Sequence, residues 1–150
     1  MLAAAVTQLI PVLQTAIGPT ILISGVGLLL LTMTNRLGRA IDRSRALAGT
    51  LAKATETDRP KIEGQLKVLW RRARLIRLTI ALAAMSALSA AVLILVLFVT
   101  ALGQIDSAEL IGALFFICLG CLIGALSCFI QDINLSLAAL KLELGNAIIE

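Results

Sequence analysis

The sequence predicts an all-α integral membrane protein whose three transmembrane helices extend into a cytoplasmic antiparallel helical hairpin and a C-terminal helix. The chain is 59 % hydrophobic with a mean hydropathy of +1.01. It holds apolar runs of about twenty residues, the length that a helix needs to cross a bilayer core. Twelve of the 13 Lys and Arg residues lie between Arg36 and Arg77, with apolar runs on both sides. We expect one membrane domain over residues 1–150.

The first part of the chain predicts two helices. Residues 1–17 place apolar side chains at helical spacing without any charge, which is typical of a short amphipathic helix at the membrane interface. Gly18 and Pro19 then predict a break, because proline suits the first turn of a new helix. The first transmembrane helix is expected over residues 19–35.

One face of this first transmembrane helix carries small, hydroxyl and apolar residues at helical spacing. Its members are Thr20, Ser24, Gly27, Leu31 and Thr34. Small and hydroxyl residues allow neighbouring helices to approach closely and to form hydrogen bonds across the contact. The face is therefore interpreted as a packing surface, with a pore lining as the alternative.

Residues 36–77 predict the basic cytoplasmic hairpin. Arg36, Arg39 and Arg43 recur at helical spacing opposite an apolar stripe, and a turn around Pro60 separates two amphipathic halves of similar length. Basic residues beside a membrane span orient the chain and contact anionic lipids, which is our first interpretation of the arginines. A basic vestibule lined by the same arginines is the alternative.

The remaining segments complete the three spans. The second transmembrane helix is expected over residues 78–102 and the third over residues 110–130, joined by a connection too short for any but antiparallel neighbours. Gly120 and Gly124 form G-x-x-x-G, a pattern of close helix packing. Residues 131–150 predict a cytoplasmic C-terminal helix.

The positive-inside rule places the hairpin and the C-terminus in the cytoplasm, and the N-terminus and the Asp106 loop outside. Asp132 lies where the third span ends, and a lone carboxylate at that depth is costly. We therefore predict an ion pair, although a solvated interfacial carboxylate is nearly as well supported. The candidate partners are Arg36, Arg39, Arg74 and Arg77.

The composition offers little for catalysis. There is no His, the commonest general base and metal ligand, so we expect neither an enzyme nor a metal or cofactor site. Cys118 and Cys121 form C-x-x-C, but inside an apolar run without a second ligand pair they favour small-residue packing. Because the basic residues adjoin the spans, they do not indicate nucleic-acid binding.

The run from Ile23 to Arg45 resembles a family of small bacterial three-helix integral membrane proteins, classified as domain of unknown function 2721. Its most specific part is Asn35-Arg36-x-x-Arg39-x-x-Asp42-Arg43, and the resemblance extends from about Pro19 to Glu143. It implies a bacterial inner-membrane location and three spans. It implies no activity and no site residue.

Three helices cannot enclose a pathway alone, so transport through this protein requires a homo-oligomer. We predict an ion-conducting pore lined by the first transmembrane helix, with Arg36, Arg39 and Arg43 forming a basic cytoplasmic vestibule. The transported ion is not specified by the sequence. The alternative is a membrane-anchored scaffold whose basic helices bind a partner or anionic lipid. A carrier ranks last, because neither inverted repeats nor ionisable residues near the midplane are visible.

Overall fold

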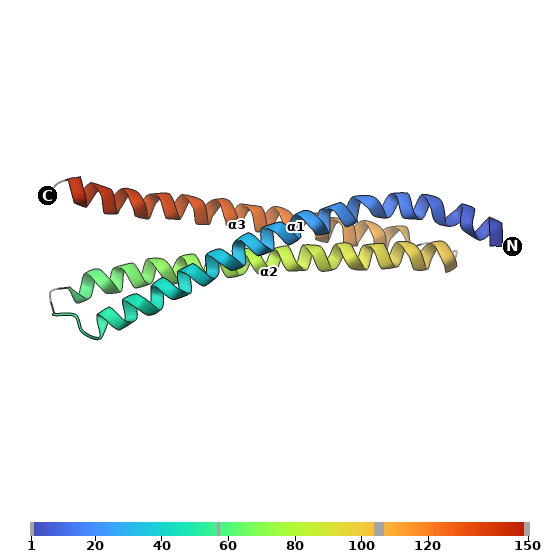
Figure 1. Cartoon of the computed structure of the whole chain (residues 1–150). Coiled ribbons are helices and arrows are strands. Elements are labelled where there is room, and N and C mark those ends of the chain that lie inside the picture. Colours follow the sequence, from blue (N-terminus) through green and yellow to red (C-terminus); the bar gives the residue numbers. More distant parts are fainter. Residues whose placement is uncertain (1, 57, 104–106, 149–150) are drawn as a thin grey trace. The chain divides into compact units, whose positions relative to one another are not determined.

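The computed structural model describes the backbone of residues 2–56, 58–103 and 107–148, and within them the side chains from residue 10 to residue 137. The described residues form three helices (Figure 1). They are α1 (Leu2–Leu51), α2 (Arg59–Gly103) and α3 (Ala108–Ile148). No strand occurs among the described residues. The prediction of an all-α chain with three long apolar helices is confirmed.

The predicted break at Gly18 and Pro19 is wrong. Helix α1 runs without interruption through Pro11 and Pro19, so residues 1–17 do not form a separate amphipathic helix. Each proline removes one backbone hydrogen bond, whereas opening the helix in an apolar run would leave several backbone groups without partners. Continuing the helix through each proline is therefore the less costly solution.

Helix α1 ends at Leu51, and helices α2 and α3 begin close to the turn residues Pro60 and Ser107. Helix α2 starts one residue before Pro60, and the carbonyl of Asp58 accepts a hydrogen bond from Ile62 N at 3.1 Å. At the start of α3, the carbonyl of Ser107 accepts one from Ile111 N at 3.0 Å. Both contacts close the first helical turn, as expected at helix N-termini. Asp106, placed by prediction in the outer loop, lies outside the described residues.

The chain packs as two units, and every helix contributes a segment to each. Unit 1 contains residues 1–31 and 81–124, and unit 2 contains residues 32–80 and 125–150. Within unit 2, the second part of α1 and the first part of α2 are joined by the turn and run in opposite directions (Figure 1). Residues 36–77 therefore lie in the second part of α1, the turn and the first part of α2.

Buried side chains recur every seven residues along each helix. Helix α1 buries Val26, Met33 and Ala40; α2 buries Leu69, Ile76, Ala83 and Ala90, and also Thr79, Ser86 and Leu93; α3 buries Cys118, Ala125 and Asp132. A seven-residue repeat of buried positions is the pattern of left-handed coiled coils, where side chains of one helix fit between those of the next.

The core of unit 1 consists mainly of small side chains. In α2, Ala83 and Ser86 are 0 % exposed, and Ser89 and Ala90 are also buried. Against them lies Cys118 of α3, which is 3 % exposed. Small residues at these positions let helix backbones approach closely, which is the packing mode of helices in membranes.

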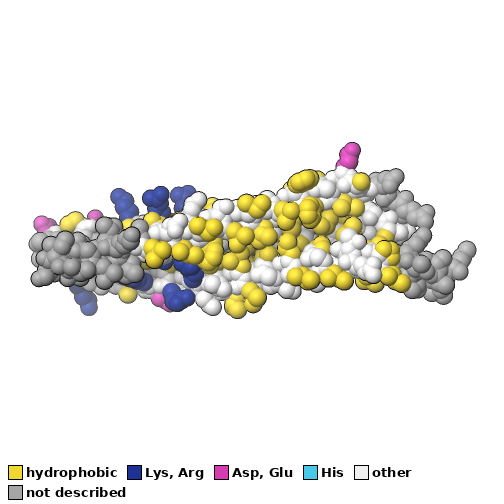
Figure 2. All heavy atoms as spheres, turned by 90° about the horizontal axis from the view of Figure 1, so that it is seen from above, with side chains coloured by type: hydrophobic (Ala, Val, Ile, Leu, Met, Phe, Trp, Pro, Cys, Tyr) yellow, Lys and Arg dark blue, Asp and Glu magenta, His cyan; other side chains and the backbone are white. Residues whose placement is uncertain are grey.

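Many large apolar side chains are exposed. Three of the described helices are long and apolar enough to cross a membrane. In the most apolar stretch of α1, α2 and α3, only 17 %, 28 % and 11 % of the residues are buried. Figure 2 shows hydrophobic side chains spread over much of the visible surface. Large outward-facing apolar surfaces of this extent are typical of membrane spans. Helix length and composition thus indicate a multi-pass membrane protein.

Candidate functional site

The site with the strongest polar contacts centres on Asp132 in unit 2. This residue follows Cys118 and Ala125 at successive intervals of seven on α3, so the repeat that buries those two side chains also turns Asp132 inward. Its side chain is 0 % exposed. A buried carboxylate needs partners of opposite charge, because desolvation of an isolated ion is very costly.

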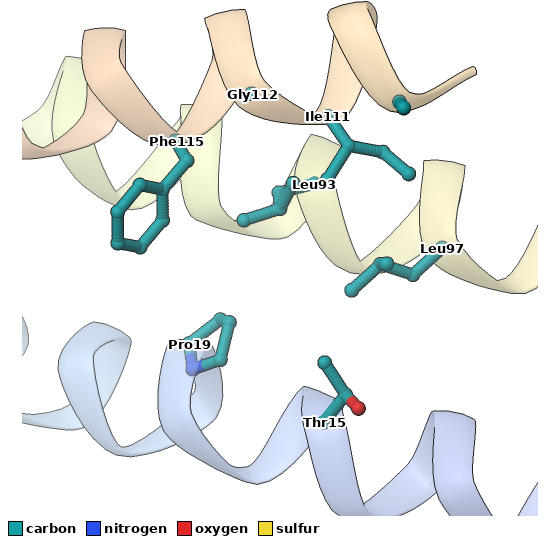
Figure 3. A pocket seen from close by; sticks show the side chains of 8 residues that line it. Thr15, Pro19, Leu93, Leu97, Ile111, Gly112 and Phe115 are labelled. Atoms are coloured by element: carbon teal, nitrogen blue, oxygen red, sulfur yellow. The ribbon is translucent and has the colours of Figure 1, made fainter.

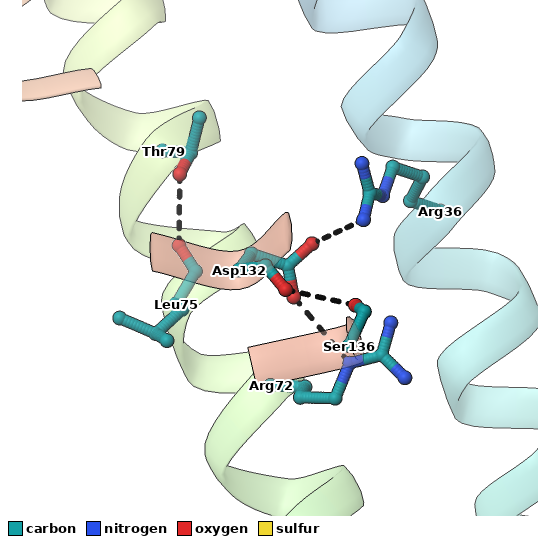
Figure 4. A network of polar contacts seen from close by, with 6 residues as sticks. All are labelled: Arg36, Arg72, Leu75, Thr79, Asp132 and Ser136. Carbon is teal, nitrogen blue, oxygen red and sulfur yellow. Dashed lines mark hydrogen bonds and ion pairs between the residues drawn. The ribbon is translucent and has the colours of Figure 1, made fainter. Parts of the chain in front are cut away.

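Two arginines supply that charge (Figure 4). Arg36 of α1 places Nη2 2.7 Å from Asp132 Oδ2, and Arg72 of α2 donates from Nε to Oδ1 at 3.5 Å. The carboxylate therefore joins one segment of each helix of unit 2. We call these three residues the Arg–Asp–Arg cluster.

The two halves of the carboxylate are bound differently. Arg36 Nη2 makes the shorter contact, with Oδ2, but its alignment is not that of a hydrogen bond, so the contact is described as an ion pair. The longer Arg72 contact meets the geometry of a hydrogen bond. Two cations around one anion leave the cluster with a net charge of +1.

The arginines reach the edge of the packed interior. Their side chains are 22 % and 23 % exposed for Arg36 and Arg72, in contrast to the buried carboxylate. The guanidinium carbon of Arg36 also lies 5.5 Å from the centroid of the Phe129 ring, a favourable cation–π arrangement. Arg36 is thus held by both a carboxylate and an aromatic face of α3.

Neighbouring hydroxyl groups bind their own helices. Ser136 donates to the backbone carbonyl of Asp132 at 2.8 Å, and Thr79 donates to the carbonyl of Leu75 at 3.0 Å. Such bonds to the carbonyl four residues earlier satisfy a hydroxyl without a partner on another helix. Among the described residues, the carboxylate itself is contacted by Arg36 and Arg72.

Sequence reasoning named one of the two partners. Arg36 was among the four predicted arginines, whereas Arg39, Arg74 and Arg77 are exposed in the structure. Arg72 was missed. The sequence does place Arg72 in the seven-residue repeat of α2, because it precedes the buried Thr79 by seven residues and Ser86 by fourteen.

Arg36 differs in environment from the other two arginines of the predicted vestibule. Arg39 and Arg43 are exposed, while Arg36 is drawn toward Asp132. Arg36 and Arg72 are the two half-buried cations among the twelve Lys and Arg of residues 36–77, and the other ten are exposed. Figure 2 shows Lys and Arg side chains in dark blue at the upper and lower margins of the left half of the molecule.

The hydroxyl and glycine face of α1 is exposed along its whole length. This holds for Thr20, Ser24, Gly27, Leu31 and Thr34. Thr20 donates to the carbonyl of Ala16 at 2.8 Å, and Ser24 donates to that of Thr20 at 3.3 Å. A side chain added at Gly27 would meet nothing within 4 Å. These residues take no part in the core of the single chain.

The two glycines of α3 occupy different surroundings. A Cβ at Gly124 would lie 3.2 Å from Cδ1 of Leu82 in α2, whereas one at Gly120 would meet nothing within 4 Å. Gly124 therefore permits a close approach between α2 and α3 within unit 1. Gly120 leaves its surface open.

The cysteines lie in packed or partly packed positions as free thiols. Cys118 is buried, and Cys121 and Cys128 are half-buried. No three His, Cys, Asp or Glu side chains come together as metal ligands in the part of the chain that the structure describes.

A comparison with protein families matches residues 16–142 to the model described as "Protein of unknown function (DUF2721)". No curated protein and no solved structure matches the chain. The matched region includes the exposed face of α1, the Arg–Asp–Arg cluster and most of α3. Since it covers more than half of the 150 residues, the chain belongs to the DUF2721 family.

Proposed function

We propose that this protein assembles into a homo-oligomer whose α1 helices surround an ion-conducting pore. The observation that carries the proposal is the exposed α1 face of hydroxyl groups and glycine, which the core of the single chain does not use. Toward lipid, small polar residues contribute less apolar contact than the leucines and isoleucines that flank them. Around a symmetry axis, the same residues would provide hydroxyl oxygens for a water-filled path.

The lining would consist of Thr20, Ser24 and Gly27, followed by Leu31 and Thr34. Leu31 is 61 % exposed and is the bulkiest side chain of the face, so it would form the apolar constriction. Apolar constrictions in channels can gate by excluding water. Gly27 would give the widest part of the path.

At the basic end, Arg39 and Arg43 would form the vestibule. Arg36 is engaged by Asp132 and Phe129, so its role in this proposal is to hold α1 to α3 rather than to line the path. Rings of arginine attract anions and repel cations. The vestibule therefore favours anions. Conductance recordings in different salts identify the conducted ion.

The proposal places the chain in the bacterial inner membrane with the basic hairpin in the cytoplasm and the N-terminus outside. Exposed basic residues beside the spans support this orientation through the positive-inside rule. Trp70 of α2 supports the same boundary, because it is 74 % exposed and lies just before the apolar part of the helix. Exposed tryptophans are enriched at membrane interfaces.

The subunit number and the central density of the purified protein test the proposal. Native mass spectrometry and particle imaging in lipid nanodiscs are expected to give a ring of four or more subunits with α1 at the axis. A monomer, or a dimer that buries the α1 faces against each other, contradicts the pore.

Thiol modification then tests the lining. In planar bilayers, a charged methanethiosulfonate reagent is expected to block current through Ser24→Cys. The matched control is Leu95→Cys on α2, which is also exposed, at 64 %, but lies outside the proposed lining. Equal responses of both variants would remove α1 from the path.

The exposed basic residues favour a second candidate, a membrane-anchored scaffold that binds anionic lipid or an acidic partner. Ten exposed Lys and Arg residues of unit 2 support it. Each basic residue near an anionic surface contributes about 1 kcal/mol. Under this reading, Arg39→Gln with Arg43→Gln reduces the anionic lipid that copurifies, while Ser24→Leu does not; the pore predicts that Ser24→Leu abolishes conduction.

A further inference from the structure

The geometry points to a binding site for a lipid alcohol in unit 1: we propose that its chain fills an apolar cavity and its hydroxyl donates to the backbone carbonyl of Thr15. The cavity measures about 510 Å³ and is formed by segments of all three helices (Figure 3). Its wall includes Thr15, Pro19, Leu93, Leu97, Gly112 and Phe115. This volume falls within the range of small-molecule sites.

The lining is almost entirely apolar. Leucine and phenylalanine side chains from α2 and α3 face the proline ring of α1 across the space (Figure 3). An apolar cavity favours an apolar occupant, because water inside it would have fewer hydrogen-bond partners than an ordered water needs. In a chain with three membrane-spanning helices, the apolar molecules at high concentration around it are lipids.

One backbone acceptor lies next to this wall, because Thr15 and Pro19 both line the cavity. In a helix, the carbonyl of residue 15 points toward the backbone nitrogen of residue 19, but Pro19 has no N–H to donate. The Thr15 carbonyl therefore lacks its ordinary helical donor. A backbone acceptor without a donor in apolar surroundings is costly, so a ligand hydroxyl at this place is stabilising.

The hydroxyl groups of Thr15 and Thr20 donate to other backbone carbonyls. Thr15 donates its own Oγ1 proton to the carbonyl of Pro11 at 2.9 Å. Thr20 donates to the carbonyl of Ala16 at 2.8 Å. A hydroxyl has one proton, so neither group can also donate to the Thr15 carbonyl in this arrangement. Neither of these two hydroxyl groups therefore occupies the acceptor.

The depth of the cavity suits a lipid with a hydroxyl head. Leu97 lies six residues before the end of α2 at Gly103, which is about 9 Å along the helix. Gly112 lies four residues after the start of α3 at Ala108, about 6 Å along that helix. A lipid alcohol at this level keeps its hydroxyl near the interface and its chain in the apolar interior.

The test uses photoactivatable hexadecanol and its methyl ether, which share the apolar chain but differ in the donor. Wild-type protein in nanodiscs is expected to be labelled about two- to tenfold more by the alcohol than by the ether, as the loss of one hydrogen bond implies. Labelled peptides should come from the segments around Thr15, Leu97 and Gly112. Equal labelling by both probes would overturn the proposed hydrogen bond.

Two pairs of variants separate the cavity from the acceptor. Gly112→Leu fills the cavity and is expected to reduce labelling at least fivefold, while Gly120→Leu does not; a Cβ at either glycine meets nothing within 4 Å. Pro19→Ala restores the N–H and should remove the preference for the alcohol. Pro11→Ala, outside the cavity, should retain it. Labelling that persists in Gly112→Leu, or a preference that persists in Pro19→Ala, refutes the site.

Discussion

Ser86 of α2 and Cys118 of α3 exchange hydrogen bonds through each other's backbone. Ser86 Oγ donates to the carbonyl of Cys118 at 2.9 Å, and Cys118 Sγ donates to the carbonyl of Ser86 at 3.3 Å. Both residues are buried in unit 1. The pair combines small size, which permits close helix contact, with a polar link across that contact.

Removing the hydroxyl should weaken the α2–α3 contact modestly. We expect Ser86→Ala to lower the free energy of unfolding by about 0.5–1.5 kcal/mol, the usual contribution of a hydrogen bond between membrane helices. Reversible unfolding in detergent monitored by circular dichroism measures it. The control is Ser24→Ala, which removes an exposed hydroxyl bonded within its own helix and should change stability by less than about 0.5 kcal/mol. Equal effects of the two substitutions would contradict the interhelical role.

The Arg–Asp–Arg cluster should respond more strongly to loss of the carboxylate than to loss of either arginine. Asp132→Ala leaves two cations facing each other without a carboxylate between them. We expect it to cost about 2–4 kcal/mol, toward the lower part of the range for broken buried pairs because the arginines reach solvent. Unfolding in detergent and oligomer stability are the measurements.

Substitution of the arginines should follow their distances. Arg36→Met is expected to be more destabilising than Arg72→Met, since Arg36 lies closer to the carboxylate and also stacks on Phe129. The control replaces all three cluster residues by Met, Leu and Met, which should be nearly neutral because no charge is then left unpaired. Unchanged stability of Asp132→Asn would refute the structural role of the cluster.

The two glycines of α3 should respond differently to enlargement. Gly120→Ala is expected to stabilise the protein by about 0.5–1 kcal/mol, because alanine favours helix and the site is open. Gly124→Ala should gain little or nothing, since the new methyl meets Leu82 at 3.2 Å. Gly124→Leu should cost about 1–3 kcal/mol by overpacking. The three unfolding free energies in one detergent decide, and a stabilising Gly124→Leu would contradict the packing.

Orientation can be tested with impermeant maleimide on bacterial cells. Under the proposed topology, Glu109→Cys at the start of α3 is labelled in intact cells, whereas Lys53→Cys in the turn between α1 and α2 is labelled only after lysis. The wild-type protein, whose cysteines lie in the apolar part of α3, is the background control. Labelling of Lys53→Cys in intact cells would invert the topology.

The three long apolar helices could be predicted from hydropathy, because membrane spans require long uninterrupted apolar runs. The continuity of α1 through Pro19 could not, since local proline chemistry favours a break and only the apolar surroundings make the continuous helix less costly. Here the environment of the whole segment outweighs the preference of two residues.

At the site, one partner of Asp132 could be predicted from the sequence and the other could not. An ion pair for Asp132 follows from its depth, and Arg36 lies at the matching level of the first helix. Arg72 was hidden among several cations on α2, and helical spacing alone did not reveal which one faces α3. The seven-residue burial repeat makes that choice, and it becomes visible once the buried alanines and serines of α2 are aligned.

The seven-residue repeat alone does not fix the register between α2 and α3. In α2, Ala83 and Ala90, and likewise Thr79 and Ser86, repeat small buried side chains at an interval of seven, so size alone does not distinguish these neighbouring heptads. For Asp132, however, a slide by seven residues along α2 replaces Arg72 with Gln65 or Thr79, neither of which is a cation. A polar residue in an otherwise apolar repeat specifies register in coiled coils. Asp132 therefore specifies the alignment of α3 with α2 that places it beside Arg72.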